Sequence, residues 1–252
     1  MKIIHKFIFI FLAVTLMILV FGFVSARKSR QILIDTIGNE SVLIVNEALD
    51  KMDRSIANRI EEMQAYADTE ALKLAITKSN ETFAKKDDIA NYIDTIDKEW
   101  TSFSGKPSSP YIRRHMGSDL SLGLRKKIDF YEKKYGYRVF SEIFVTNRYG
   151  ANVGESGKTT DYRQDDEEWW QIAKRDGLYL SDLGYDESSG VYSIDICVRI
   201  DDSGGNFLGV LKGIFNVAEL IDLVQELSQS DDNGFAKNVL VGHEGHKTME
   251  YL

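Results

Sequence analysis

The feature that most constrains the fold is an uncharged apolar run near the start of the chain, from Phe7 to Ala26. About 20 apolar residues in a helix cross a bilayer core, and this run has that length. The sequence therefore predicts a membrane anchor over residues 1–27, with everything after about residue 27 extracytoplasmic. A cleaved signal peptide is the alternative, because Val24-Ser25-Ala26 resembles a small-residue cleavage site.

Composition excludes several classes of protein. The formal net charge of −8 argues against a nucleic-acid binder, which needs a basic face. Cys197 is the single cysteine, so neither an intrachain disulfide nor a cysteine-based metal cluster is expected.

A second long helix pattern follows the apolar run. Residues 30–76 contain no proline, and apolar residues recur at spacings of three and four, as one buried helix face requires: Val45, Leu49, Met52, Ile56, Ile60, Met63 and Ala67. Arg59 stands where a strict heptad would be apolar, so the pattern favours a helix packed on its own domain over a pure coiled coil. We predict a long helix over residues 28–80. A parallel dimer along its upstream part is the alternative.

The rest of the chain changes from helical to strand patterns. Asp87 or Asp88 and Ser118 are expected to cap two shorter helices, and Gly136 ends the second. Asp165 or Asp166 is expected to cap another helix, with Glu167 and Glu168 in its first turn. Strands are predicted over residues 137–146, 178–183, 191–200 and 207–215. Helices followed by a meandering sheet indicate an α+β fold.

Motifs for metal, nucleotide or catalysis are incomplete. His243-Glu244-Gly245-His246 is one residue short of the zinc-protease spacing, and Gly154 to Thr159 lacks the first glycine of a phosphate-binding loop. No Ser/His/Asp or Cys/His set is apparent. We therefore expect neither an enzyme nor a cofactor or metal, although a secreted or anchored hydrolase is kept as the alternative from another class.

The stretch from Asp161 to Asp195 carries the candidate ligand site. Trp169 and Trp170 are neighbours on a predicted helix and face about 100° apart, so we expect one in the core and the other on a pocket wall. On the strand 191–200, even-numbered residues share one face and odd-numbered ones the other. A symmetric hairpin about Ser203-Gly204 would put Asp195 opposite Lys212. The predicted ligand-binding residues are Trp169, Trp170, Tyr179, Tyr185, Asp186, Asp195 and Lys212.

Four motifs in this order resemble the Cache family of extracytoplasmic sensor domains. They are VTNRYGANV at 145–153, DYRQDDEEWW at 161–170, GYDESSGVYSIDICVRI at 184–200 and GNFLGVLKGIFN at 205–216. The resemblance implies a PAS-like antiparallel sheet with the long helix packed alongside. By that analogy residues 81–229 form a membrane-distal ligand-binding module, and residues 230–252 begin a truncated membrane-proximal one.

The resemblance also implies the function: sensing a small molecule for a transmembrane histidine kinase or chemoreceptor, as a homodimer. One subgroup of the family binds α-amino acids through an arginine two residues before an aromatic pair and an aspartate on the last strand. This chain has Glu167 at the first position and Lys212, Gly213 and Ile214 in the region of the second. An α-amino acid is therefore less favoured than an organic acid bound by Lys212. A dimerisation ectodomain without a ligand is a further alternative.

Overall fold

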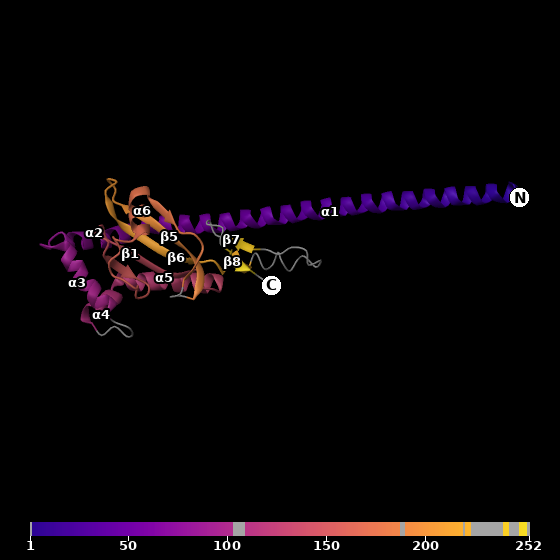
Figure 1. Ribbon diagram of the computed structural model, residues 1–252. Helices are drawn as coiled ribbons and strands as arrows, with labels where there is room; N and C mark the ends of the chain where they lie inside the picture. Colours follow the sequence, from indigo (N-terminus) through magenta and orange to yellow (C-terminus); the bar gives the residue numbers. More distant parts are fainter. Residues whose placement is uncertain are drawn as a thin grey trace. The chain divides into compact units, whose positions relative to one another are not determined.

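The computed structural model describes residues 2–102, 109–186, 190–218, 220–222, 239–241 and 247–250. The chain divides into two compact units, Met1–Lys51 and Met52–Leu252. Figure 1 labels most of the elements, which are α1 (Lys2–Ala67), α2 (Glu70–Phe83), α3 (Ile89–Thr101), α4 (Pro110–Met116), α5 (Asp119–Tyr135), β1 (Phe140–Thr146), β2 (Asn152–Glu155), α6 (Glu168–Asp176), β3 (Leu178–Leu180), β4 (Gly184–Asp186), β5 (Val191–Asp201), β6 (Phe207–Asn216), β7 (Val239–Val241) and β8 (Lys247–Glu250).

The first unit is the N-terminal part of α1. By length and composition, this helix is long and apolar enough to cross a membrane, and the described residues contain no other such helix. Its large apolar side chains are exposed, among them Phe7, Phe11 and Phe21.

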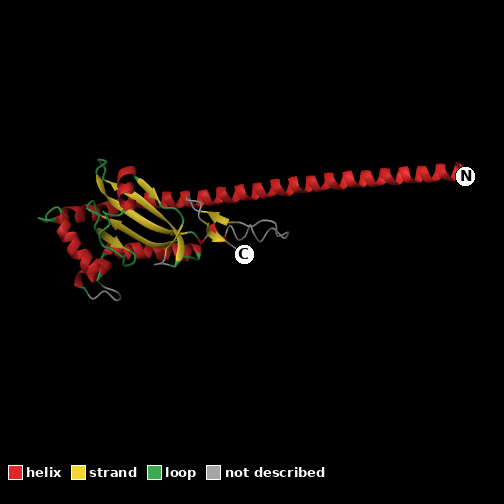
Figure 2. Ribbon diagram, in the orientation of Figure 1, coloured by secondary structure: helices red, strands yellow, loops and turns green. Residues whose placement is uncertain are grey.

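The second unit is built on one antiparallel sheet. Its strand order is β2-β1-β6-β5-β3, and β4 also pairs with β5. In Figure 2 the strands form a curved layer with helices on either side. The α+β fold with a long N-terminal helix and an antiparallel sheet is thus confirmed.

The two faces of the sheet carry different layers. The last turns of α1, together with α2 and α5, cover one face through a core that includes Met63, Leu72, Ile128, Ile196 and Phe215. On the other face, α6 packs its tryptophans against residues of β1, β5 and β6: Phe144, Cys197 and Val210. A third cluster joins α3 and α4 to the segment around Tyr162.

Local sequence explains most helix ends. Asp88 accepts a hydrogen bond from the Asn91 amide at 3.0 Å, and Ser118 caps α5 in the same way. Gly136 adopts φ +82°, the left-handed conformation that ends α5 as predicted. The long helix ends at Ala67 rather than near residue 80. The Thr69 hydroxyl donates to the Tyr66 carbonyl at 2.8 Å, which offers the backbone a local alternative to the helix.

The buried stripe of α1 begins at Met52 within the second unit and includes Met63 and Ala67. Arg59 also lies buried along it. Its guanidinium lies 4.6 Å from the Tyr135 ring centroid and 3.0 Å from the Glu62 carboxylate. The cation is therefore accommodated by an aromatic ring and an acid rather than by water.

Several predictions about elements need correction or fall outside the described residues. Pro110 begins α4, a helix absent from the predicted elements, and its fixed φ suits the first turn. The helical residues that follow β6 are described only to Asp222. Most of residues 230–252, including His243 and His246, lies outside the described part of the chain, so the second module stays a prediction.

Candidate functional site

Helix α6 begins later than the sequence predicts. Glu167 is its N-cap residue and accepts no capping hydrogen bond, while Glu168 occupies the first turn. Asp165, expected to be a cap, is instead held by the Arg163 guanidinium through contacts of 2.8 and 3.1 Å. The predicted role of the carboxylates at 165 and 166 as a cap is therefore wrong, because an arginine two residues away binds Asp165.

Both tryptophans of α6 are buried and belong to one cluster, so the core holds both of them rather than one. Trp169 is 7% exposed and Trp170 is 3% exposed. Trp169 packs edge-to-face on Phe144, with ring centroids 5.8 Å apart. Trp170 donates its indole N–H to Thr146 Oγ1 at 2.8 Å and packs edge-to-face on Phe207. Because α6 lies across the sheet, side chains 100° apart reach different strands and are both covered.

A cavity of about 580 Å³ opens beside Trp169. The strands β1, β4, β5 and β6, the start of α6 and two loops bound it. Four of the predicted residues line it: Trp169, Tyr185, Asp195 and Lys212. Its other lining residues are Glu142, Phe144, Lys158, Thr159, Thr160, Asp161, Gln164, Glu167, Ser181, Asp182, Gly184, Ser193 and Ile214.

The remaining predicted residues lie elsewhere. Trp170 lines a second cavity, and Tyr179 packs against the tryptophan cluster, where burial raises the pKa of its hydroxyl. Only the backbone of Asp186 is described, as the last residue of β4. Tyr185 is 57% exposed and packs edge-to-face on Tyr192, with centroids 5.2 Å apart.

An ion pair forms the floor of the cavity. Lys212 Nζ lies 2.7 Å from Asp195 Oδ2 and 4.6 Å from the Trp169 ring centroid. The predicted direct opposition of the two residues is wrong: Cys197 faces Lys212, and Asp195 faces Ile214. An irregularity between Ile200 and Asp201 shifts the register, but a diagonal offset of two keeps both charges on one face.

The charge of the lining is predominantly negative. Five side chains carry carboxylates, namely Glu142, Asp161, Glu167, Asp182 and Asp195, against the two ammonium groups of Lys158 and Lys212. Because a partly closed cavity screens charges less than bulk water does, this imbalance favours a ligand with a positive group.

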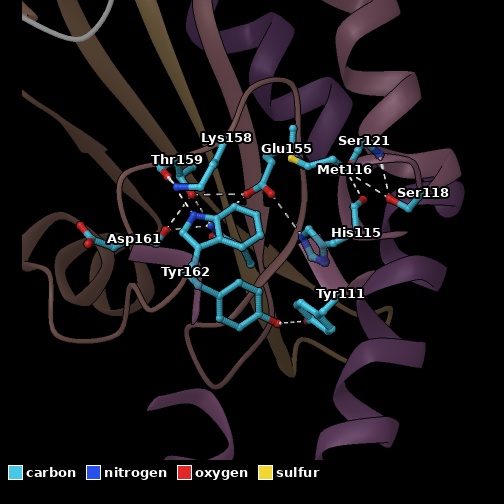
Figure 3. A network of polar contacts seen from close by, with 12 residues as sticks. Tyr111, His115, Met116, Ser118, Ser121, Glu155, Lys158, Thr159, Asp161 and Tyr162 are labelled. Carbon is cyan, nitrogen blue, oxygen red and sulfur yellow. Dashed lines mark hydrogen bonds and ion pairs between the residues drawn. The ribbon is translucent and has the colours of Figure 1, made fainter. Parts of the chain in front are cut away.

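A buried polar network supports the cavity wall that runs from Lys158 to Asp161 (Figure 3). The Thr159 hydroxyl donates to the Asp161 carbonyl at 2.7 Å, and the Trp100 indole donates to the Thr159 carbonyl at 2.8 Å. The Asn152 amide donates to Glu155 at 3.1 Å and to the Thr159 hydroxyl at 2.9 Å. The wall is therefore fixed from behind by side chains that do not line the cavity.

His115 and Glu155 meet inside this network, as Figure 3 shows, with Nε2 and Oε1 3.5 Å apart. Burial lowers the pKa of His115 to about 4. Burial, and next the nearby Glu142 carboxylate, raise the pKa of Glu155 well above its usual range. Burial therefore favours the neutral form of each group, and neither of these two atoms has a hydrogen-bond partner in the described structure.

Sequence reasoning missed most of the acidic lining. Glu142 and Phe144 alternate along β1 with the core residues Ile143 and Val145, and this strand period could have revealed them. Lys158, Asp161 and Gln164 come from a loop, which has no periodicity to indicate where its side chains lie.

Comparison of the chain with known proteins finds similarity to solved structures. No family model and no curated protein matches it. The sensory domain of the Campylobacter jejuni chemoreceptor Tlp3 is 11% identical over 79% of this chain and 73% of that one, with a TM-score of 0.38. The ligand-binding domain of the Pseudomonas aeruginosa PAO1 amino acid chemoreceptor PctC, solved with GABA, is 16% identical over 65% and 75%, with a TM-score of 0.38.

A further similar structure is the extracellular domain assigned to the histidine kinase rpHK1S-Z16, 12% identical over 79% of this chain and 75% of that one, with a TM-score of 0.34. The chain is thus similar, over most of its length, to sensor domains of chemoreceptors and histidine kinases.

Proposed function

We propose that this chain is the extracytoplasmic ligand-sensing region of a membrane-anchored receptor of the histidine kinase or chemoreceptor type. The cavity of about 580 Å³ carries the proposal. Its size, its aromatic wall and its few convergent charges are typical of a small-molecule site. The apolar start of α1 supports an anchor at the membrane.

The ligand we favour carries a positively charged group. The ammonium of Lys212 already has a partner in Asp195, at 2.7 Å, so binding a carboxylate there would require that pair to open. Five carboxylates line the cavity, and Trp169 and Tyr185 add aromatic faces that attract cations. The organic acid predicted from Lys212 remains the alternative, and the experiment below separates the two.

The mechanism is a shift between two packings of α6 on the sheet. A ligand that contacts Trp169 on α6 and Asp195 on β5 would favour one packing over the other. The end of α1, from Met52 to Ala67, packs on the opposite face of the same sheet. In this proposal, α1 carries the change toward the membrane.

Thermal unfolding tests the proposal. The full chain in a neutral sugar-headed detergent is heated with panels of amines, amino acids and carboxylates. A ligand at about 100 times its Kd stabilises the folded state by about 2.7 kcal/mol, which raises the Tm by roughly 5–10 °C for a domain of this size. We expect amines to give the largest shifts. A shift from carboxylates alone would favour the organic acid, and no shift from any panel would contradict a ligand site.

A pair of exposed aromatic residues provides the variant and its control. Tyr185→Ala removes a cavity wall, and because Tyr185 is 57% exposed the substitution costs little folding energy. Phe130→Ala on α5 removes a side chain that is 61% exposed and does not line the cavity. The first variant should weaken ligand binding about tenfold, and the second should leave it unchanged. Equal binding by both would exclude this cavity as the site.

A further inference from the structure

A second cavity, of about 700 Å³, borders the α6 residues that follow Trp169. Its lining differs in kind from that of the first cavity. Five basic side chains line it, namely Arg148, Arg163, Lys174, Arg175 and Arg199, together with Asp165 as the single acid. This concentration of cations stands out in a chain whose formal net charge is −8.

The cavity has an apolar and aromatic floor. Trp170 and Ile93 are each 3% exposed and contribute the buried part, and Tyr149 and Ile89 lie beside them. Such a floor contacts the carbon skeleton of a ligand, while the basic groups above it contact charged oxygens.

Three of the cations contact one residue, Phe207: Arg148 at its backbone carbonyl, and Lys174 and Arg199 at its ring. The Arg148 guanidinium donates to the Phe207 carbonyl at 2.8 Å. Lys174 Nζ lies 5.4 Å from the Phe207 ring centroid, and Arg199 Cζ lies 5.1 Å from it. Lys174 is also 4.9 Å from the Trp170 ring centroid. Like charges held around one residue repel each other, and a bound anion would relieve that repulsion.

Carboxylates neutralise only part of this charge. Arg163 is paired with Asp94 and Asp165, Arg175 with Asp176, and Arg199 with Asp201, at 2.6–2.8 Å. Among the described residues, no carboxylate lies within ion-pair distance of Arg148 or Lys174. These two groups are thus available for an external anion.

We propose that the second cavity is a binding site for a small organic anion that carries a phosphate or carboxylate group. The Arg148 fork fits two oxygens of either group, and Lys174 supplies a point charge. The floor of Trp170 and Ile93 holds the organic part. The site shares no lining residue with the first cavity, and the proposal does not rest on the sensing function proposed above.

Calorimetric titration tests the site. The full chain in neutral detergent and about 50 mM salt is titrated with phenyl phosphate, benzoate, inorganic phosphate and benzylamine. We expect saturable binding of phenyl phosphate or benzoate, at least threefold tighter than that of inorganic phosphate, because the floor contacts the ring. Absence of saturable binding for all three anions would overturn the proposal, as would equal or tighter binding of benzylamine.

Matched charge changes locate the binding. Arg148→Gln with Lys174→Gln removes the two available cations and should weaken anion binding at least tenfold. Lys126→Gln with Lys133→Gln removes the same charge from the exposed surface of α5 and should change binding less than twofold. Equal losses in both double variants would mean that the anion responds only to net charge, and the site would be rejected.

Two single variants complete the test. Lys174→Gln alone guards against loss of folding, since this ammonium contacts only two ring faces in the described structure, and it should weaken binding at least threefold. Lys212→Met in the first cavity should leave anion binding unchanged. If Lys212→Met abolishes it while Lys174→Gln does not, the anion binds in the first cavity, and the second-site proposal fails while the sensing proposal stands.

Discussion

His115 lies buried beside Glu155, and its burial makes the stability of the second unit depend on pH. Replacing His115 alone separates its contribution from those of the other titrating groups. In the folded protein burial lowers the pKa of His115 to about 4, from 6.5 in an unfolded chain. Between these values the unfolded chain binds a proton and the folded one does not. His115 therefore favours folding at neutral pH and loses that contribution as the pH falls below about 6.5.

The magnitude follows from the two pKa values. Each unit of difference is worth about 1.4 kcal/mol, and integration from pH 7.5 to pH 4.5 gives a loss of about 2.5 kcal/mol from His115 alone. Glu155 acts in the opposite sense. Its raised pKa favours folding at low pH, and that contribution is lost as the pH rises above the usual carboxyl range.

The assay compares His115→Gln with wild type in urea unfolding at several pH values. Tryptophan fluorescence reports the second unit alone, because the three tryptophans all lie in it. The difference in unfolding free energy between wild type and variant is first measured at pH 7.5. At pH 4.5 this difference should have moved by about 2.5 kcal/mol in favour of the variant. Glu155→Gln should shift the difference oppositely, gaining relative to wild type as the pH rises.

Parallel pH curves for wild type and His115→Gln would refute this reasoning. They would mean that the pKa of His115 is the same in the folded and unfolded states. Curves that diverge in the opposite sense, with the variant losing stability relative to wild type at low pH, would instead indicate an imidazolium–carboxylate ion pair across the 3.5 Å contact. A direct NMR titration of the His115 ring, expected to show no protonation down to about pH 5, decides the same question without any variant.

Two further predictions, both measured by urea unfolding, concern a close backbone approach at Gly209 and the hydrogen bonds of the buried Asn80 side chain. Gly209→Ala would place a Cβ atom 2.0 Å from the Thr146 carbonyl oxygen and should lower the free energy of unfolding by about 3 kcal/mol or more. The control Gly123→Ala, with open space around it on α5, should raise the free energy of unfolding by about 0.5–1 kcal/mol. Equal effects of the two substitutions would contradict the close approach of β6 to Thr146. Asn80→Ala would leave the Leu208 carbonyl and the Arg148 amide without their side-chain partner and should cost about 2–4 kcal/mol, against near zero for the exposed Thr82→Ala.

Strand periodicity predicted the faces of β5 correctly but not its exact pairing. Ile196 and Ile200 lie in the core on one face, and Cys197 lies in the tryptophan cluster on the other, because alternation is a property of the strand itself. The pairing of Asp195 depended on the turn. The turn is centred on Gly204, since the Asp202 amide donates to the Asn206 carbonyl, and the irregularity before Asp201 shifts the pairing by one further residue. Together they move the partner of Asp195 from Lys212 to Ile214, and neither residue type nor turn composition signals the irregularity.

The candidate site was predicted in part for the same reason. Trp169, Asp195 and Lys212 belong to regular elements whose faces follow from period, and they line one cavity. Lys158 and Asp161 come from a loop fixed by contacts with distant residues, such as the Trp100 indole. Such contacts depend on the tertiary fold, so the negative charge of the lining, and with it the ligand we favour, emerged only from the structure.

The consecutive tryptophans of α6 have a consequence for how signals combine. This helix of nine residues presents Trp169 to one cavity and Trp170 to the other. A displacement of so short a helix changes both cavities together. Any ligand that shifts α6 from one cavity must therefore alter affinity at the other, and thermodynamic reciprocity requires the same factor in both directions. Two unlike molecules, one cationic and one anionic, would then act as joint inputs to a single conformational output.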